Sequence, residues 1–297
     1  MDVVFITGGT GLIGRHLLEE MVKNEDISVI WSLYRSQVPF VHEKIKWIKG
    51  DMDHLPEIPS SEKITKVIHA AALMERYTAK GDSPKRLYES NIRWTENMIA
   101  FCRRYEVNEL IYFSSINVRL KHIGVYSRSK LQCEKLIRES GLKTKIVRPA
   151  LVYGKGKNGL TTLMHYIRSL PVVPVFGNGR AKEQPIFVTD LAKLVICCMM
   201  DHQASELVEL CGKEPMEYDA MVRLMAQTMG RKARIIHLPF RPFYYSLLLL
   251  EKLNIALPVS PEQVAHISED LVADMSGICK RYQISLTDFA EGLKSLD

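Results

Sequence analysis

One stretch near the start of the chain decides the fold: Val3-Val4-Phe5-Ile6-Thr7-Gly8-Gly9-Thr10-Gly11-Leu12-Ile13-Gly14. An apolar run typical of a strand leads into a glycine-rich turn, and apolar residues at helical spacing follow. A strand, a glycine turn and a helix start, in this order, predict a site for a dinucleotide. Gly8 would permit the tight turn, Gly11 the approach of a pyrophosphate, and Gly14 close packing of the helix on the strand. The helix N-terminus would offer N–H donors to the phosphates.

The same alternation of strand and helix patterns continues through the first two-thirds of the chain. It predicts an α/β fold: a Rossmann-type, doubly wound parallel sheet covered on both faces. We expect strands at 3–7, 28–34, 45–49, 66–69, 110–114, 144–151 and 206–211, and helices at 12–23, 84–105, 126–140, 160–169 and 190–200.

The pattern changes beyond this point and predicts a smaller mixed cap that binds substrate. We expect residues 1–153, rejoined by 185–212, to form the dinucleotide-binding core, and residues 154–184 and 213–297 to form the cap. The cleft between them is the expected substrate site. Within the cap we expect a strand at 235–238 and helices at 219–229, 244–253, 261–270 and 286–296.

Composition and charge narrow the class of protein. The chain has 297 residues, 46% hydrophobic and 25% charged, as is ordinary for a soluble globular protein. Its net charge of +6 suits anionic ligands such as nucleotides. No arginine-rich or aromatic-interleaved tract supports nucleic-acid binding. The nine histidines show no ligand spacing, so we expect no metal site.

The expected location is the cytoplasm. Six cysteines form no CxxC pair, which indicates free thiols in a reducing compartment. We expect no signal peptide, because the strand-like apolar run already begins at residue 2. The longest apolar stretch, residues 243–250, is far shorter than the ~20 residues of a membrane span, so we expect no transmembrane segment. A core or interface helix is the first interpretation of this stretch, and contact with a membrane surface is the alternative.

Tyr126-Ser127-Arg128-Ser129-Lys130 is the second informative stretch. A tyrosine and a lysine four residues apart at the start of a helix share one face. A nearby ammonium favours the phenolate and lowers the pKa of the tyrosine. Tyr126 would then exchange protons near neutral pH. The alternative is a tyrosine on the helix face beside a solvated lysine.

Several motifs together resemble the extended short-chain dehydrogenases/reductases, the NAD(P)-dependent epimerases and dehydratases, over nearly the whole chain. The glycine turn is similar to that family's cofactor turn. The further motifs, in the family's order, are His69-Ala70-Ala71-Ala72, Asn91-Ile92-Arg93-Trp94-Thr95-Glu96-Asn97, Phe113-Ser114-Ser115-Ile116-Asn117-Val118, Arg148-Pro149-Ala150-Leu151-Val152-Tyr153-Gly154 and Phe187-Val188-Thr189-Asp190-Leu191-Ala192.

The resemblance implies an enzyme that transfers a hydride between a nicotinamide and a substrate carbon. Tyr126 would exchange a proton with the substrate hydroxyl or carbonyl, Lys130 would hold the nicotinamide ribose, and Ser115 would hydrogen-bond the reacting oxygen, with Ser114 as the alternative. The implied cofactor contacts are Gly8, Thr10, Gly11, Leu12, Ile13, Gly14, Arg35, Asp51, Met52, Ala70, Ala71, Asn91, Ser114, Tyr126, Lys130, Pro149 and Val152.

The residues after the second predicted strand favour NADP over NAD. An NAD site usually has Asp or Glu about 20 residues beyond the glycine turn, to accept hydrogen bonds from the ribose. Tyr34-Arg35-Ser36 stands there instead. A guanidinium pairs well with a 2′-phosphate. The alternatives are stacking of Arg35 on adenine, solvent exposure of Arg35, and NAD as the cofactor.

Two departures from the family concern the substrate side. Ser115 and Tyr126 are only eleven residues apart, where the family more often has twenty or more. Glu183-Gln184 stands where sugar-nucleotide epimerases often have Arg-Asp. Arg180 and Lys182 would serve an anionic diphosphate, and the alternative is a hairpin turn at residues 177–180 with a solvated arginine.

The leading hypothesis is an NADP-dependent oxidoreductase or epimerase that acts on a nucleotide sugar, by 4-keto reduction or C4 epimerisation. A sterol or phenylpropanoid carbonyl is the alternative substrate, supported by the apolar residues 242–257. The rival from another class is a regulator or assembly subunit that binds NADP(H) without turnover. Because the superfamily often dimerises through two long helices, we expect a homodimer through residues 84–105 and 126–140.

Overall fold

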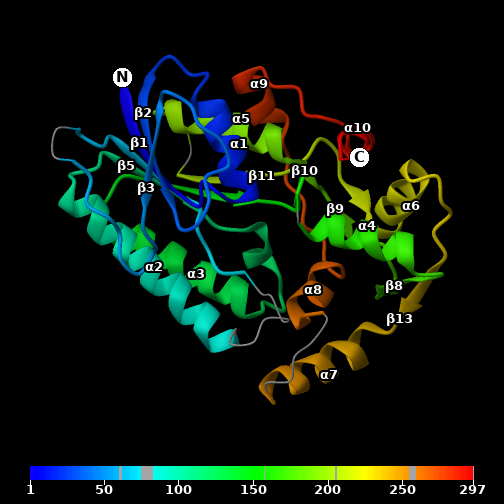
Figure 1. Cartoon of the computed structure of the whole chain (residues 1–297). Coiled ribbons are helices and arrows are strands. Elements are labelled where there is room, and N and C mark those ends of the chain that lie inside the picture. The colour runs from blue at the N-terminus through cyan, green and yellow to red at the C-terminus, as the bar shows by residue number, and fades with distance from the viewer. Residues whose placement is uncertain (60–61, 75–82, 157, 205, 254–258, 297) are drawn as a thin grey trace.

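A parallel sheet of seven strands forms the centre of the part that the computed structural model describes, which is residues 1–59, 62–74, 83–156, 158–204, 206–253 and 259–296 (Figure 1). Its strand order is β11-β6-β5-β4-β1-β2-β3. The strands are β1 Asp2–Thr7, β2 Ile27–Tyr34, β3 Ile45–Lys49, β4 Lys66–His69, β5 Glu109–Phe113, β6 Thr144–Pro149 and β11 Leu207–Leu210. The predicted doubly wound sheet is confirmed.

Helices cover both faces of the sheet because its strands bury both faces. In β1, Val4 and Ile6 join one apolar cluster and Phe5 joins the other. Helices α1 (Leu12–Met21) and α5 (Val188–Met200) pack together over the first face. Helices α2 (Pro84–Arg104) and α3 (Val125–Glu139) lie side by side on the second (Figure 1).

The strand order reverses direction between β1 and β4, and this places the site. The chain moves outward from β1 to β2 and β3, then returns to β4 on the other side of β1. In open α/β sheets, ligands bind outside the carboxyl ends of the strands at such a switch point. The glycine turn follows β1 there, and residues 70–74 follow β4.

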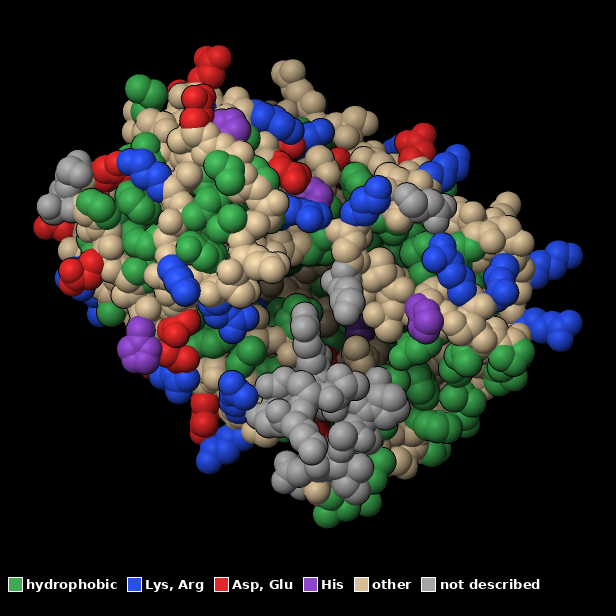
Figure 2. Space-filling view, in the orientation of Figure 1, with side chains coloured by type: hydrophobic (Ala, Val, Ile, Leu, Met, Phe, Trp, Pro, Cys, Tyr) green, Lys and Arg blue, Asp and Glu red, His purple; other side chains and the backbone are tan. Residues whose placement is uncertain are grey.

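A second group of elements beside the sheet has its own apolar cluster, which includes Leu160, Val175, Met221 and Phe289. Figure 2 shows that the surface is hollowed between this group and the sheet. Its elements are α4 Gly159–Ser169, β8 Val173–Phe176, β9 Lys182–Glu183, β12 Met216–Glu217, α6 Tyr218–Thr228, β13 Ile235–Leu238, α7 Phe240–Lys252, α8 Pro261–His266 and α10 Phe289–Lys294. Buried apolar residues of α7 and α8 join the apolar cluster on the first face of the sheet instead.

The sequence patterns placed the second group less accurately than the sheet. Residues 261–270 and 286–296 were expected as single helices, but α8 and α10 are each six residues long, and α9 (Ser276–Tyr282) was not expected. Residues 177–180 do not close a hairpin, because β8 pairs with β13 in parallel and β9 pairs with β12. The remaining short elements are β7 Val152–Tyr153, β10 Ile186–Phe187 and the 3-10 helix η1 Ile116–Arg119.

Candidate active site

Two glycines of the turn after β1 are required by the protein's own packing. Gly8 has φ +77°, and a Cβ there would lie 2.8 Å from the backbone carbon of Ala70 and the backbone nitrogen of Ala71. A Cβ on Gly14 would lie 2.0 Å from the Gly8 carbonyl oxygen. The turn therefore fits tightly between the start of α1 and the end of β4.

Gly11 is different, because the described protein atoms leave it nearly free. A Cβ there would meet one atom within 4 Å, the Gly8 oxygen at 3.2 Å. Gly11 is the N-cap of α1, no side chain caps the helix, and no acidic residue stands in its first turn. A helix start with free N–H groups, no carboxylate and room above its glycine fits the pyrophosphate of a dinucleotide. Thr10 is exposed beside it, and Leu12 and Ile13 begin the helix half-buried.

Tyr126 and Lys130 lie on one face of the first turns of α3, at the carboxyl end of β5. The Lys130 side chain is buried, and its Nζ donates a hydrogen bond of 2.7 Å to the Phe113 carbonyl oxygen. The same Nζ lies 5.8 Å from the ring centre of Tyr126 and 4.8 Å from that of Tyr112. Burial lowers the pKa of Lys130 to about 8.

His69 adds no positive charge beside this lysine. Burial and the Lys130 ammonium lower the pKa of His69 to about 3, so the imidazole is neutral. Its Nδ1 lies 2.9 Å from the Thr7 hydroxyl at the end of β1. Lys130 is therefore the positive charge that burial places against Tyr126.

Ser114 and Ser115 have different surroundings. The Ser114 hydroxyl donates 2.6 Å to buried Glu134, which Arg148 holds through two hydrogen bonds of 2.8 and 2.7 Å. Burial raises the pKa of Glu134, but the bonds from Arg148 and Ser114 outweigh this effect and lower the pKa. Ser115 is half-buried, and its Oγ accepts a hydrogen bond of 3.2 Å from the Asn117 N–H at the start of η1. Ser115 therefore remains the proposed contact for the reacting oxygen.

Helix α8 holds the start of α3, a contact that the sequence did not predict. Buried Glu262 accepts hydrogen bonds from the Ser127 hydroxyl (2.5 Å) and the Ser127 N–H (3.2 Å). A Cβ on Gly124 would lie 2.4 Å from the Glu262 carboxylate. The S-x-x-Q pattern of Ser260 and Gln263 marks the start of α8 as a capping box, but it does not identify the partner of Glu262.

The last residue of α8 reaches the other end of the short loop between Ser115 and Tyr126. His266 Nδ1 lies 3.1 Å from Asn117 Oδ1, and His266 Nε2 lies 3.1 Å from Glu183 Oε1, at ion-pair distance but without hydrogen-bond geometry. Burial would lower the pKa of His266, but the Glu183 carboxylate outweighs burial and raises it. Both ends of the loop thus rest on α8.

The residues predicted for the adenine side lie at the ends of β2 and β3. Arg35 is exposed directly after β2 and has no hydrogen-bond or ion-pair partner within the described part of the chain. Asp51 accepts hydrogen bonds from the N–H groups of Asp53 and His54 in its own turn. Met52 is buried against the second face of the sheet.

The other predicted cofactor contacts lie after β4, on α2, at the end of β6 and at the start of β7. Ala71 N–H donates to the Thr7 hydroxyl at 3.3 Å, beside Ala70. Asn91 on α2 accepts from Leu73 N–H (2.8 Å) and donates to Ser129 on α3 (3.0 Å), so it ties residues after β4 to the helix of Tyr126. Pro149 ends β6, and half-buried Val152 begins β7.

Arg180 and Lys182, the residues predicted to bind an anionic substrate, are exposed before and within β9. The Lys182 N–H donates to Asp270 at 2.8 Å, and the neighbouring Glu183 is the partner of His266. The backbone next to Lys182 is therefore linked to the site through His266.

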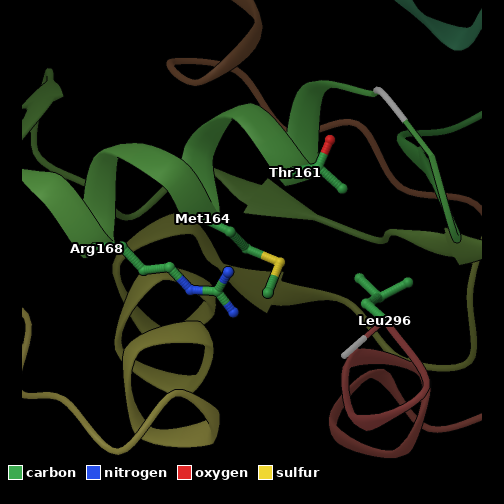
Figure 3. Close-up of a pocket in the computed structure, with 4 residues that line it drawn as sticks. All are labelled: Thr161, Met164, Arg168 and Leu296. Carbon is green, nitrogen blue, oxygen red and sulfur yellow. The ribbon is translucent and has the colours of Figure 1, made fainter.

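A separate cavity of about 380 Å³ lies in the second group of elements. Figure 3 shows Thr161, Met164 and Arg168 of α4 facing Leu296 near the end of the chain. None of these lining residues belongs to the glycine turn or to α3, so this cavity is distinct from the site around Tyr126.

Two further findings concern the described residues as a whole. No helix among them combines the length and apolar character needed to cross a membrane. No group of three or more His, Cys, Asp or Glu side chains within the same residues is arranged to hold a metal ion.

A sequence model of the NAD dependent epimerase/dehydratase family matches residues 4–211. This chain belongs to that family. The match covers the glycine turn, the segment after β4, Tyr126 with Lys130, and the 187–192 motif. The family implied by the sequence motifs is therefore confirmed, and with it membership of a family of NAD-dependent enzymes.

The proteins similar to this chain include named reductases and a solved epimerase. The chain is 28% identical over 242 residues to a ceramide reductase of Caulobacter vibrioides, covering 80% of this chain and 74% of the relative. It is 28% identical to the human short-chain dehydrogenase/reductase family 42E member 1, covering 65% of this chain and 56% of the human protein. A solved UDP-glucuronic acid 4-epimerase of Bacillus cereus is similar with a TM-score of 0.74 at 17% identity, covering 99% and 97% of the two chains.

Proposed function

We propose that the chain catalyses oxidation or reduction at a hydroxyl or carbonyl carbon, with Tyr126 as the group that transfers the proton. The observation that carries this proposal is the buried Lys130 ammonium 5.8 Å from the Tyr126 ring centre. A positive charge held there stabilises the phenolate that forms when Tyr126 gives its proton away. Because the pKa of Lys130 is about 8, this charge is present at neutral pH.

The remaining catalytic roles fall to residues at the same edge of the sheet. Ser115 would orient the reacting oxygen by a hydrogen bond, and Lys130 would hold a ribose hydroxyl with the donors that Phe113 does not use. The nicotinamide, when bound, supplies or accepts the hydride. The open space beside Gly11 and the start of α1, which no side chain caps, support a pyrophosphate at this position.

We further propose a preference for NADP(H). Exposed Arg35 follows β2, where an NAD site would place an acidic residue, and it has no partner among the described side chains. A guanidinium there would pair with a 2′-phosphate. The matched family is described as NAD-dependent, so the choice between the two cofactors is a proposal about this chain alone.

For the substrate we propose a lipophilic alcohol or ketone. A relative with 28% identity over most of both chains is named a ceramide reductase. Helix α7 supports this class, because Tyr244 is buried against His122, in the loop between Ser115 and Tyr126, with ring centres 5.1 Å apart. An apolar helix therefore borders the site.

A nucleotide sugar is the second candidate, as the sequence motifs first indicated. The solved epimerase of similar fold is named as a complex with UDP-glucuronic acid and NAD. In this case Arg180 and Lys182 would contact the diphosphate. An assay with long-chain ketones and sterols in one arm and UDP-linked sugars in the other separates the two classes.

Replacement of one tyrosine tests the catalytic assignment. Tyr126→Phe removes the proton donor, so carbonyl reduction should fall by roughly 10²–10⁴-fold. The affinity for NADPH should stay nearly unchanged. The measurements are steady-state turnover with the preferred carbonyl and NADPH binding by fluorescence titration.

Tyr166→Phe is the matched control, because Tyr166 is an exposed tyrosine on α4. Normal turnover by Tyr126→Phe would overturn the assignment. Tight NADPH binding by the wild-type protein without turnover of any carbonyl or alcohol would instead support the non-catalytic regulator or assembly subunit.

A further inference from the structure

Helix α7 has apolar side chains both on its packed side and on its open side. Tyr244, on the packed side, is buried with its ring 5.1 Å from those of His122 and Phe240. Tyr245, Leu249 and Leu253 follow one another at four-residue spacing and are 61%, 60% and 61% exposed. A helix that packs apolar residues inward and still exposes an apolar stripe has a second contact surface.

The apolar surface continues onto the neighbouring strand pair. Ile236 of β13 is 48% exposed and stands in register with exposed Pro174 of β8. Phe243 of α7 is 41% exposed, with its ring centre 5.5 Å from that of Phe176 on β8. Figure 2 shows hydrophobic side chains gathered over β13 and α7. We call this surface, made of Ile236, Phe243, Tyr245, Leu249 and Leu253, the α7 face.

Positive charge lies beside the α7 face, in the residues that lead into β13 and into α7. Residues 220–250 contain five Lys and Arg and no Asp or Glu. Arg231, Lys232 and Arg234 lead into β13, and Arg241 opens α7; all four are exposed. In Figure 2, Lys and Arg side chains stand along the edge of the molecule beside the hydrophobic patch.

We propose that the α7 face docks on a membrane surface that contains anionic phospholipid. Apolar side chains on the open side of a helix, with Lys and Arg beside them, match the acyl boundary and the headgroup charge of such a bilayer. Glu251, the acidic residue of α7, is half-buried and acts on Tyr244 of the packed side. A second copy of the chain would place two cationic edges together, which the charge pattern disfavours.

The opposite side of α7 packs on His122 in the loop between Ser115 and Tyr126, so the docked helix borders the catalytic site. Membrane docking is an additional property of the chain, beyond the proposed function. It would allow a lipophilic substrate to reach the site directly from the bilayer. Residues 254–257, the end of the apolar stretch noted in the sequence, lie outside the described residues and carry no part of the argument.

Sedimentation of the full chain with vesicles tests the proposal. The probes are vesicles of phosphatidylcholine alone and of phosphatidylcholine mixed with phosphatidylglycerol. We expect the wild-type chain to sediment with the mixed vesicles, and to bind the neutral vesicles at least about tenfold more weakly. High salt should reduce binding to the mixed vesicles.

Leu249→Glu should reduce binding to the mixed vesicles by about tenfold or more, because it places a charge in the apolar stripe. Val41→Glu is the matched control, since Val41 is 83% exposed in the segment before β3, outside the α7 face. Lys232→Glu tests the cationic edge separately. Circular dichroism and NADPH binding establish that each variant is folded.

Three outcomes would overturn the proposal. One is a wild-type chain that stays in the supernatant with both kinds of vesicle. Another is Leu249→Glu binding as well as Val41→Glu does. The third is a wild-type dimer that Leu249→Glu dissociates, in the absence of vesicle binding, since the α7 face would then be a contact between copies. None of these readouts uses turnover, so failure here is separate from failure of the catalytic assignment.

Discussion

The pKa of Lys130 is set by burial and by neighbouring groups that act in opposite directions. Burial lowers its pKa to about 8, and the neighbouring Cys133 and Glu134 partly oppose this effect. The Phe113 carbonyl fixes its Nζ, while Tyr112 and Tyr126 place their rings around it. The positive charge of Lys130 therefore acts on Tyr126 from a fixed position. This charge is present at neutral pH and is lost above about pH 8.

This titration predicts the pH dependence of carbonyl reduction. The Lys130 ammonium is present below about pH 8 and is lost above it, so its support for the Tyr126 phenolate is lost as pH rises through that value. Reduction by the wild-type protein should fall above about pH 8. Lys130→Arg keeps the charge at all accessible pH values and should move this fall to higher pH, whatever its overall rate. An unchanged pH profile in Lys130→Arg would contradict the role of the lysine.

Arg35 makes the cofactor preference testable at a single side chain. Hydrogen bonds to charged groups contribute about 1.5–3 kcal/mol, so Arg35→Ala should weaken NADPH binding by roughly ten- to a hundredfold. NADH binding should change little, because NADH lacks the 2′-phosphate. Titration of both cofactors against both proteins measures this difference. Equal losses for the two cofactors would remove the 2′-phosphate argument, and Arg35→Lys should retain part of the preference.

At the scale of elements, α8 contacts both ends of the short loop between Ser115 and Tyr126. Glu262 bonds Ser127 at one end of the loop and His266 bonds Asn117 near the other. Ser115 and Tyr126 are only eleven positions apart, and a helix from the second group of elements contacts the chain near both of them.

Glu262→Ala should lower the free energy of unfolding by about 2 kcal/mol, because it leaves the Ser127 donors without their charged acceptor. It should also lower turnover more than NADPH affinity, because the loss is local to the start of α3. Glu262→Gln retains an acceptor oxygen and should recover most of both. Denaturant unfolding and steady-state kinetics give the two quantities, and a stable, fully active Glu262→Ala would show that α8 does not position Tyr126.

The sheet and its site could be anticipated because each depends on local patterns. The turn at Gly8–Gly14 and the Tyr126–Lys130 pair follow from spacing along a strand and a helix, which is set within a few residues. The contacts of Glu262 and His266 could not be anticipated, since they join residues 135 and 149 positions apart. Periodicity gives no information about such pairs.

The shorter elements of the second group escaped prediction for a related reason. Strands β9 and β12 have two residues each, too few to show alternation. Residues 267–270 continue the pattern of α8, but the helix ends at His266. Tertiary contacts there, such as Asp270 with Lys182 N–H, outweigh local preference.

At the scale of the whole molecule, two proposed binding surfaces border the site at Tyr126: the glycine turn with Arg35, and the α7 face. We propose that the glycine turn and Arg35 bind the nucleotide at the carboxyl edge of the sheet. The packed side of α7 contacts His122, in the loop that leads to Tyr126. A nucleotide at the glycine turn and a lipophilic substrate beside α7 would then meet at Tyr126, where the reacting carbon would lie next to the nicotinamide.

A crystal structure of the chain with NADP⁺ tests this arrangement most directly. It should show the pyrophosphate on the N–H groups that begin α1, and a ribose hydroxyl at hydrogen-bond distance, about 2.7–3.2 Å, from Lys130 Nζ. The nicotinamide ring should lie beside the Tyr126 hydroxyl and Ser115. A nicotinamide bound away from Tyr126, or a Tyr126 hydroxyl turned out of the crevice, would contradict the catalytic account.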